Sequence, residues 1–217
     1  MSPRFIVFDL DGTLVDSRRD LADSANALLA ECGAAGLTEQ AIGRMVGDGA
    51  ATLIARAFAA SGLDPPAGAL DRFLAIYDTR LLNHTRPYPK MSEVLTALGT
   101  RALLAVLTNK PIGATHRVLD GLDLRRHFPE NRIVGGDGAF ARKPDPAGLR
   151  HLIAIAGVPV RETMMVGDST IDWRTARNAG TGVCLARYGF GFEGFSAEQL
   201  EDGVLAADQP EQLLAIL

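Results

Sequence analysis

The sequence predicts an α/β fold, with a doubly wound parallel sheet and an inserted segment that is entirely helical. Short apolar runs alternate with helical patterns along most of the 217 residues, whereas residues 18–84 show helical patterns without a convincing strand. Alternating strands and helices are typical of a parallel sheet that helices cover on both faces. The chain is long enough to form such a core together with a smaller insertion.

Five short apolar runs are expected to form buried strands of this sheet. These runs lie at 5–8, 102–107, 132–134, 164–166 and 182–185. Apolar residues spaced three and four apart indicate helices between them, and a glycine often follows where the helix should end. These helices are expected at 91–98, 111–122, 146–156 and 170–179.

Residues 18–84 are expected to form a helical cap that is inserted after the first strand. The expected division is a core made of residues 1–17 and 85–217 and a cap made of the residues between them. The two joints fall at 16–18 and 86–89. Two prolines stiffen the second joint, because proline disfavours helix in the residue that precedes it.

Composition and charge favour a soluble cytoplasmic protein that binds neither nucleic acid nor a membrane. The net charge is -4 and no run of Lys or Arg is present, which argues against a polyanionic partner. No apolar stretch reaches the roughly 18 residues of a membrane span, and two aspartates interrupt the first apolar run too early for a signal peptide. Cys32 and Cys184 are isolated, which favours buried free thiols over a disulfide or a zinc site.

The most informative stretch is the pair Asp9 and Asp11, which follows the apolar run 5–8 at the end of the first expected strand. Alternate residues of an extended chain point to the same side, so the two carboxylates are expected to converge. At a separation of about 4 Å and an effective dielectric constant of about 20, two carboxylates repel each other by roughly 4 kcal/mol. The pair therefore requires a cation, a shared proton or both.

Polar residues also follow three other expected strands or their loops, and each has an ordinary structural explanation. Thr108 and Asn109 follow the run 102–107, where Asn109 would alternatively cap the next helix. Lys143 lies in a proline-rich loop, where most lysines are only solvated. Asp168 and Asp172 follow the run 164–166, where acids at a helix start would also complement the helix dipole. Together these residues indicate a site at one edge of the sheet.

This ordered set of motifs resembles the haloacid dehalogenase (HAD) superfamily, whose members are mostly magnesium-dependent phosphatases with an aspartate nucleophile. The motifs are Asp9-x-Asp11-Gly12-Thr13, Thr108-Asn109, Lys143-Pro144 and Gly167-Asp168-Ser169-x-x-Asp172. Within that superfamily the chain is most similar to the phosphoglycolate phosphatase family, also through Val46-Gly47-Asp48-Gly49-Ala50 and Thr85-Arg86-Pro87-Tyr88-Pro89. The resemblance implies a Rossmann-like core with a helical cap after the first strand. This agrees with the helical insertion at residues 18–84 that the spacing of apolar residues predicts.

The resemblance also implies a role for each core residue. Asp9 would attack phosphorus and form an aspartyl phosphate, while Asp11 would protonate the leaving oxygen and later activate water. Mg2+ would be held by the carboxylates of Asp9 and Asp168 and the backbone carbonyl of Asp11, with Asp172 supporting them from outside. The phosphate would be bound by Thr108, Asn109 and Lys143.

The cap is expected to set specificity through the turn Gly47-Asp48-Gly49 and the nearby Arg44. Free amides at the following helix start would receive a small carboxylate such as that of phosphoglycolate, although Asp48 or Gly49 would equally serve only as a helix cap. The chain departs from the family pattern at Asp48 and Ile171, where asparagine is common. An acid at position 48 would repel a substrate carboxylate unless its side chain points away.

The expected reaction is hydrolysis of a small phosphorylated metabolite, with 2-phosphoglycolate as the preferred substrate, by a monomer or homodimer. The retained acid Asp11 makes cleavage of carbon-halogen or carbon-phosphorus bonds improbable, because the dehalogenases and phosphonatases lack an acid there. Three different functions stay open: a sugar-phosphate phosphatase or pyrophosphatase, a β-phosphoglucomutase-like phosphomutase, and a non-catalytic binding module. Residues 189–192 form either a flap near the site or a plain connection.

Overall fold

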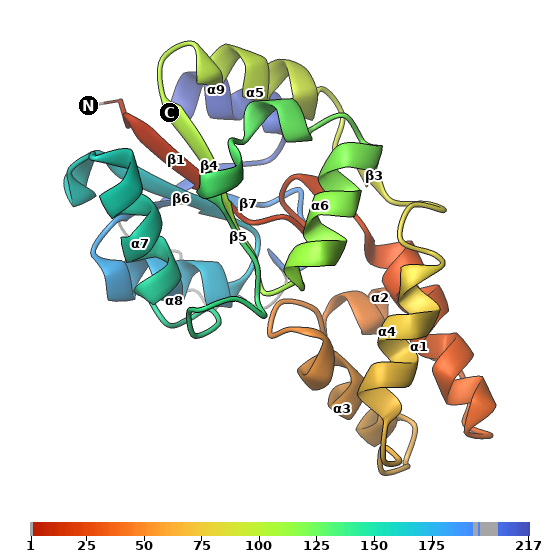
Figure 1. Cartoon of the computed structure of the whole chain (residues 1–217). Coiled ribbons are helices and arrows are strands. Elements are labelled where there is room, and N and C mark those ends of the chain that lie inside the picture. Colours follow the sequence, from red (N-terminus) through yellow and green to blue (C-terminus); the bar gives the residue numbers. More distant parts are fainter. Residues whose placement is uncertain (1, 193–194, 196–203) are drawn as a thin grey trace.

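The computed structural model describes residues 2–192, 195 and 204–217. A parallel sheet of six strands forms its centre, in the order β5-β4-β1-β6-β7-β8 (Figure 1). The strands are β1 (Phe5–Phe8), β4 (Leu103–Leu107), β5 (Ile133–Val134), β6 (Thr163–Gly167), β7 (Gly182–Ala186) and β8 (Leu205–Ala207). The predicted α/β fold with a doubly wound parallel sheet is therefore confirmed, and the five expected strands are present. The sixth strand, β8, lies at the edge of the sheet and was not predicted.

The central position of β1 explains why polar residues from distant parts of the chain meet. β1 pairs in parallel with β4 on one side and with β6 on the other, so Phe8 lies level with Val106 and Val166. The residues that follow these three strands consequently emerge at one edge. The chain also reverses its direction of winding beside β1, and such switch points are where ligands bind in open α/β sheets.

Side chains of β1 alternate between two apolar layers. Ile6 and Phe8 face the layer that contains α5 (Met91–Gly99), α6 (Ile112–Gly121) and α9 (Leu213–Ile216). Phe5 and Val7 face the opposite layer, which contains α7 (Ala147–Ala156) and α8 (Thr170–Ala179). All four side chains of β1 are buried, because helices cover both faces of the sheet.

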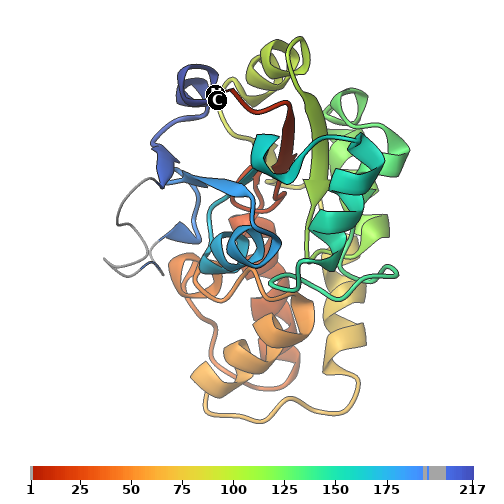
Figure 2. The same ribbon diagram turned by 90° about the vertical axis from the view of Figure 1, so that its left-hand side faces the viewer.

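Residues 18–84, called the cap below, fold into four helices that pack on one another. These are α1 (Arg18–Glu31), α2 (Glu39–Gly43), α3 (Ala50–Ala60) and α4 (Ala69–Asp78). Figures 1 and 2 show them together at one end of the molecule, beyond the edge of the sheet. Their apolar side chains, such as Phe58 and Phe73, belong to the same buried cluster as Phe8. The boundaries of a separate cap domain remain a prediction, since one apolar cluster spans both parts.

A short antiparallel ribbon joins the cap to the core. It pairs β2 (Val15–Asp16) with β3 (Arg86–Pro87), at the two positions where the sequence predicts the joints. Neither strand was predicted, because two residues are too few to show a periodic pattern. The ribbon places the two ends of the cap side by side.

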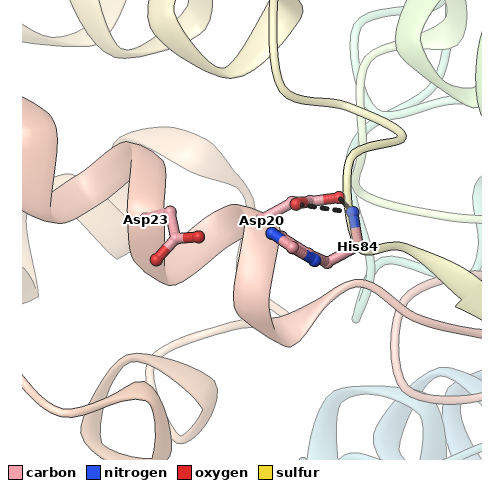
Figure 3. Close-up of side chains that lie close together, drawn as sticks. All are labelled: Asp20, Asp23 and His84. Carbon is pink, nitrogen blue, oxygen red and sulfur yellow. Dashed lines mark hydrogen bonds between the residues drawn. The ribbon is translucent and has the colours of Figure 1, made fainter.

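The carboxylate of Asp20, on the first turn of α1, holds the second joint in place. It accepts hydrogen bonds from the backbone amides of His84 and Thr85 and from the Thr85 hydroxyl, at 2.7 to 3.0 Å. Figure 3 shows the contact with His84 and the nearby side chain of Asp23. Because a buried carboxylate requires several donors, this arrangement stabilises the attachment of the cap.

Both cysteines are free, as predicted. Cys184 is buried as expected, but the expected burial is wrong for Cys32, which is partly exposed at the end of α1. Among the described residues, no helix combines the length and apolar character needed to cross a membrane.

Candidate active site

Three carboxylates from two strand ends meet at the edge of the sheet that faces the cap. Asp9 follows β1, Asp168 follows β6, and Asp172 lies on the first turn of α8. Each offers a carboxylate oxygen, and the three oxygens lie within 4.8 Å of one another. All three residues are buried. The sequence therefore located these acids correctly at one edge.

Lys143 neutralises part of this negative charge. Its Nζ atom lies 2.8 Å from Oδ1 of Asp9 and 2.6 Å from Oδ1 of Asp172, and its side chain is only 2% exposed. Burial alone would lower the pKa of Lys143, but Asp172 and Asp9 outweigh burial and hold the pKa above its ordinary value. The interpretation of Lys143 as a merely solvated loop lysine is thus wrong.

Lys143 does not balance the negative charge of the three clustered carboxylates. Three carboxylates and one ammonium leave a formal charge of -2. Burial, together with the carboxylates of Asp172 and Asp11, raises the pKa of Asp9 to about 7, although Lys143 opposes this. Burial, Asp172 and Asp9 likewise raise the pKa of Asp168 well above its ordinary value. At neutral pH this cluster therefore requires a bound proton, a further cation or both.

The donor set fits Mg2+, which prefers oxygen ligands. Oδ1 of Asp9 is buried and lies 2.8 Å from Nζ of Lys143, which also contacts Asp172. Because three acids share this one cation, their carboxylate oxygens are natural ligands for a divalent ion. Asp172 differs, because Lys143 contacts its Oδ1 atom while Ser169 donates to its Oδ2 atom from both the backbone amide and the hydroxyl. This arrangement favours an indirect role in which Asp172 positions Lys143.

Asp168 is held by close backbone contacts rather than by charged partners. The amide of Gly191 donates to its Oδ2 atom at 2.7 Å. Gly12 has a φ of 85°, and a Cβ atom at this position would lie 2.0 Å from the same oxygen. A Cβ atom on Gly189 would lie 2.2 Å from the Cβ atom of Asp168. The segment 189–191 therefore lies directly against the site, and a side chain at position 189 or 191 would collide with Asp168.

Thr108 and Asn109 follow β4 and connect the site to its surroundings. The Asn109 amide nitrogen donates to the carbonyl oxygens of Gly47 and Lys143, and its Oδ1 atom accepts from the Lys143 amide. The expectation that Asn109 caps the next helix is wrong, because the carboxylate of Asp137 accepts from the first amide of α6 instead. Asn109 thus positions the loop of Lys143 and touches the cap. Thr108 is buried beside it, and its Oγ1 atom accepts from the Lys110 amide.

Asp11 is not one of the three clustered acids, and other side chains hold its carboxylate. The hydroxyl of Ser17 donates to its Oδ1 atom at 2.6 Å, and Nζ of Lys110 lies 3.1 Å from both of its oxygens. Lys110 also donates to the Tyr77 hydroxyl at 2.6 Å. Sequence reasoning assigned no role to Lys110, Tyr77 or Ser17. The position of Lys110 directly after Thr108-Asn109 is the one signal that pointed to it.

Lys110 and its partner Tyr77 are both buried. Burial lowers the pKa of Lys110, but the charge of Asp11 and the contact with Tyr77 outweigh burial and hold this pKa above its ordinary value. Burial raises the pKa of Tyr77 to about 12, although the ammonium of Lys110 opposes this. Lys110 is consequently a cation and Tyr77 a neutral phenol at neutral pH.

A cavity of about 330 Å³ separates this edge of the core from the cap. Core residues Asp9, Asp11, Thr108 and Lys110 line one part of it. The cap supplies a mostly apolar wall that includes Leu53, Phe73, Leu74, Tyr77 and Leu81. The cap therefore faces the site mainly with apolar side chains.

The predicted cap residues divide between two hollows. Gly47 and Gly49 line the main cavity, and Gly49 is the N-cap residue of α3, so the capping interpretation holds for it. Asp48 and Arg44 line a second, more polar hollow, where Asp48 forms an ion pair with Arg56 at 2.6 Å. The acid at position 48 does not line the main cavity.

Comparisons with known proteins agree with this geometry. Residues 6–186 match the family described as haloacid dehalogenase-like hydrolase. The chain is 45% identical over 200 residues to a phosphoglycolate phosphatase from Rhodospirillum rubrum, covering 88% of the chain and 82% of the relative. It is 38% identical over 207 residues to a phosphoglycolate phosphatase from Agrobacterium fabrum, and the match covers 93% of the chain and 87% of that relative. A crystal structure of a predicted phosphoglycolate phosphatase from Haemophilus somnus superposes with a TM-score of 0.89 at 30% identity, covering 100% of the chain and 98% of that structure.

Proposed function

The chain belongs to the haloacid dehalogenase-like hydrolase family and is a phosphatase, and we propose that it hydrolyses 2-phosphoglycolate to glycolate and phosphate with Mg2+. The observation that carries this proposal is the buried cluster of Asp9, Asp168 and Asp172 with Lys143, whose formal charge of -2 calls for a divalent ion. The choice of substrate is supported by relatives that are named phosphoglycolate phosphatase and share up to 45% of their aligned residues with this chain.

In this proposal Mg2+ is held by carboxylate oxygens of Asp9 and Asp168 and by the backbone carbonyl of Asp11. Bound there, the ion would offset the negative charge of the acids and of the substrate phosphate. Asp172 stays outside the metal shell and orients Lys143 through the 2.6 Å contact described above. The close packing of Gly12 and Gly191 on Asp168 fixes the direction of that carboxylate.

Asp9 is the nucleophile of the proposed reaction. A carboxylate oxygen of Asp9 attacks phosphorus, the bond between phosphorus and the ester oxygen breaks, and Asp11 gives a proton to the departing oxygen. Lys143 and the Thr108 hydroxyl stabilise the charge on the transferred phosphoryl group. In the second step Asp11 accepts a proton from water as the water attacks phosphorus, which releases phosphate and restores Asp9.

We also propose that the cap acts as a lid over this reaction. The apolar wall formed by Leu53, Phe73 and Leu81 would exclude water while the phosphoryl group is on Asp9. Gly47, Gly49 and the start of α3 would contact the substrate from the cap side, whereas Arg44 and Asp48 would act only from the second hollow.

The decisive experiment measures phosphate release from a panel of substrates with Mg2+ and after its removal by EDTA. The panel contains 2-phosphoglycolate, hexose phosphates, nucleotides and pyrophosphate. We expect 2-phosphoglycolate to give the highest kcat/KM and EDTA to abolish turnover reversibly. A preference for a hexose phosphate or pyrophosphate would overturn the assigned substrate, and isomerisation of a sugar phosphate without net phosphate release would indicate a mutase.

The covalent step has its own test. Enzyme that is quenched in acid during turnover of a 32P-labelled substrate should retain label on the peptide that contains Asp9. Absence of label in the presence of measured turnover would contradict the aspartyl phosphate. No turnover with any phosphate ester would favour a binding module.

A further inference from the structure

The cavity is lined by a buried lysine that the proposed reaction does not use. Lys143, which the reaction does use, contacts Asp9 and Asp172. Lys110 lines the cavity beside Thr108 and Asn109, and its side chain is only 4% exposed. A buried ammonium is expensive to maintain, so its presence in a ligand cavity requires an explanation.

Contacts from both the core and the cap hold the side chain of Lys110 in place. Its Nζ atom lies 3.1 Å from the two oxygens of Asp11 and donates to the Tyr77 hydroxyl at 2.6 Å. The same atom lies 4.5 Å from the centroid of the Tyr77 ring, within the range of a cation-π contact. Tyr77 belongs to α4, so the cap contributes a contact that holds the ammonium.

We propose that Lys110 binds the carboxylate of the substrate, at the end remote from phosphorus, and that Tyr77 holds the ammonium in place for this contact. The inference rests on the proposed function, because it takes 2-phosphoglycolate as the substrate. It makes Lys110 the residue that distinguishes a phosphorylated acid from a phosphorylated alcohol.

The chemistry of the substrate places its carboxylate near this lysine. Asp11 must approach the ester oxygen to protonate it, and a single methylene group separates that oxygen from the carboxyl carbon of 2-phosphoglycolate. Because Lys110 contacts both oxygens of Asp11, a group one methylene beyond the ester oxygen lies within reach of its ammonium. Phosphate and carboxylate would thus each meet a lysine, Lys143 at one end and Lys110 at the other.

Arg117 also lines the cavity and provides a natural comparison. Its guanidinium pairs with the Asp78 carboxylate, and both side chains are more than half exposed. Water therefore screens this cation, whereas Lys110 is enclosed by protein. If charge in the cavity were enough for carboxylate binding, either residue would serve, but the geometry points to Lys110 alone.

The test compares kcat/KM for 2-phosphoglycolate with kcat/KM for ethyl phosphate, which lacks the carboxylate. In Lys110→Met the ratio of these two values should fall by about 10- to 100-fold, as expected for loss of one charge-assisted contact. In the matched control Arg117→Met the ratio should stay within about twofold of the unchanged enzyme. Thermal unfolding and circular dichroism of each variant show whether the fold is kept.

Tyr77→Phe is the second variant, and it keeps Lys110, the aromatic ring and the volume of the side chain. Loss of the hydroxyl should lower the ratio by about 3- to 10-fold, mainly through KM for 2-phosphoglycolate. This variant tests the proposal even where Lys110→Met fails to fold.

An equal loss for both substrates in Lys110→Met and in Tyr77→Phe would overturn the proposal and leave Lys110 as a residue that only positions Asp11. A fall of the ratio in Arg117→Met but not in Lys110→Met would likewise overturn it. Failure of the proposed function has a different signature, because the unchanged enzyme would then release phosphate from ethyl phosphate as efficiently as from 2-phosphoglycolate.

Discussion

The core and the cap contribute opposite kinds of surface to the same cavity. The edge of the sheet supplies buried charges that contact one another, such as Asp9 and Lys143. The cap supplies an apolar wall, in which Tyr77 provides a polar contact to Lys110. In the proposed reaction the charges of the core would act on the breaking bond, while the apolar wall of the cap would exclude water and select the substrate.

The largest effect should follow from Asp9→Asn in the core. Asparagine has almost the same volume but is a poor nucleophile, so kcat should fall by about 1,000-fold or more while the fold is kept. The measurement is phosphate release with Mg2+, together with thermal unfolding.

The matched control for this variant is Asp78→Asn, which changes an acid that lines the same cavity from the cap. Its kcat should stay within a few-fold of the unchanged enzyme, because Asp78 is exposed and pairs with Arg117. Similar losses in the two variants would break the distinction between a reactive core and an accessory cap.

A second pair of variants compares glycines that both have positive φ angles. Gly12→Ala should lower the free energy of unfolding by about 2 to 4 kcal/mol and raise the Mg2+ concentration needed for activity, because the new Cβ atom would lie 2.0 Å from Oδ2 of Asp168. Gly33→Ala in the cap should cost only about 1 kcal/mol, since nothing lies within 4 Å of its Cβ position. Urea unfolding and Mg2+ titration of activity measure both effects. An unchanged Mg2+ requirement in Gly12→Ala would contradict the role of Asp168 as a ligand.

The attachment of the cap can be tested through two acids of α1. Asp20→Asn should lower the free energy of unfolding by about 2 kcal/mol, because the new amide group would face the amides of His84 and Thr85 that now donate to the carboxylate. Asp23→Asn is the control, and it should change stability by less than about 0.5 kcal/mol since Asp23 is half exposed. Equal losses in the two variants would show that Asp20 is not a specific clamp.

The smallest expected effect is a difference in the rate at which the thiols of Cys32 and Cys184 are modified. Burial raises the pKa of Cys184, on β7 of the core, to about 12, whereas Cys32 at the end of α1 in the cap is partly exposed. A thiol reagent at pH 8 should therefore modify Cys32 first, and Cys184 should react only on unfolding in urea. Rapid modification of both thiols in the folded enzyme would show that the core opens as readily as the cap.

The strands of the core were predictable because each is a short apolar run, buried on both faces. β8 was not predicted, because Leu205–Ala207 is short, contains two alanines and shows no apolar run of its own. Its position depends on pairing with β7. The ribbon of β2 and β3 depends in the same way on contacts between residues that are far apart in sequence.

The charged cluster was predictable for the same physical reason, since parallel strands bring their carboxyl ends to one edge. Asp9, Lys143 and Asp168 therefore meet as expected. The partners of Asp11 were not predictable: Ser17 and Lys110 contact its carboxylate, and Tyr77 of the cap contacts Lys110. These contacts depend on packing between distant segments, which local sequence does not encode.

Val15–Asp16 and Arg86–Pro87 lie side by side in the ribbon, so the chain leaves the core and returns to it at almost the same place. A helical segment of another length with similarly spaced ends would interrupt no strand of the six-stranded sheet. Such a replacement would also have to supply apolar side chains for the cluster that the cap shares with the core.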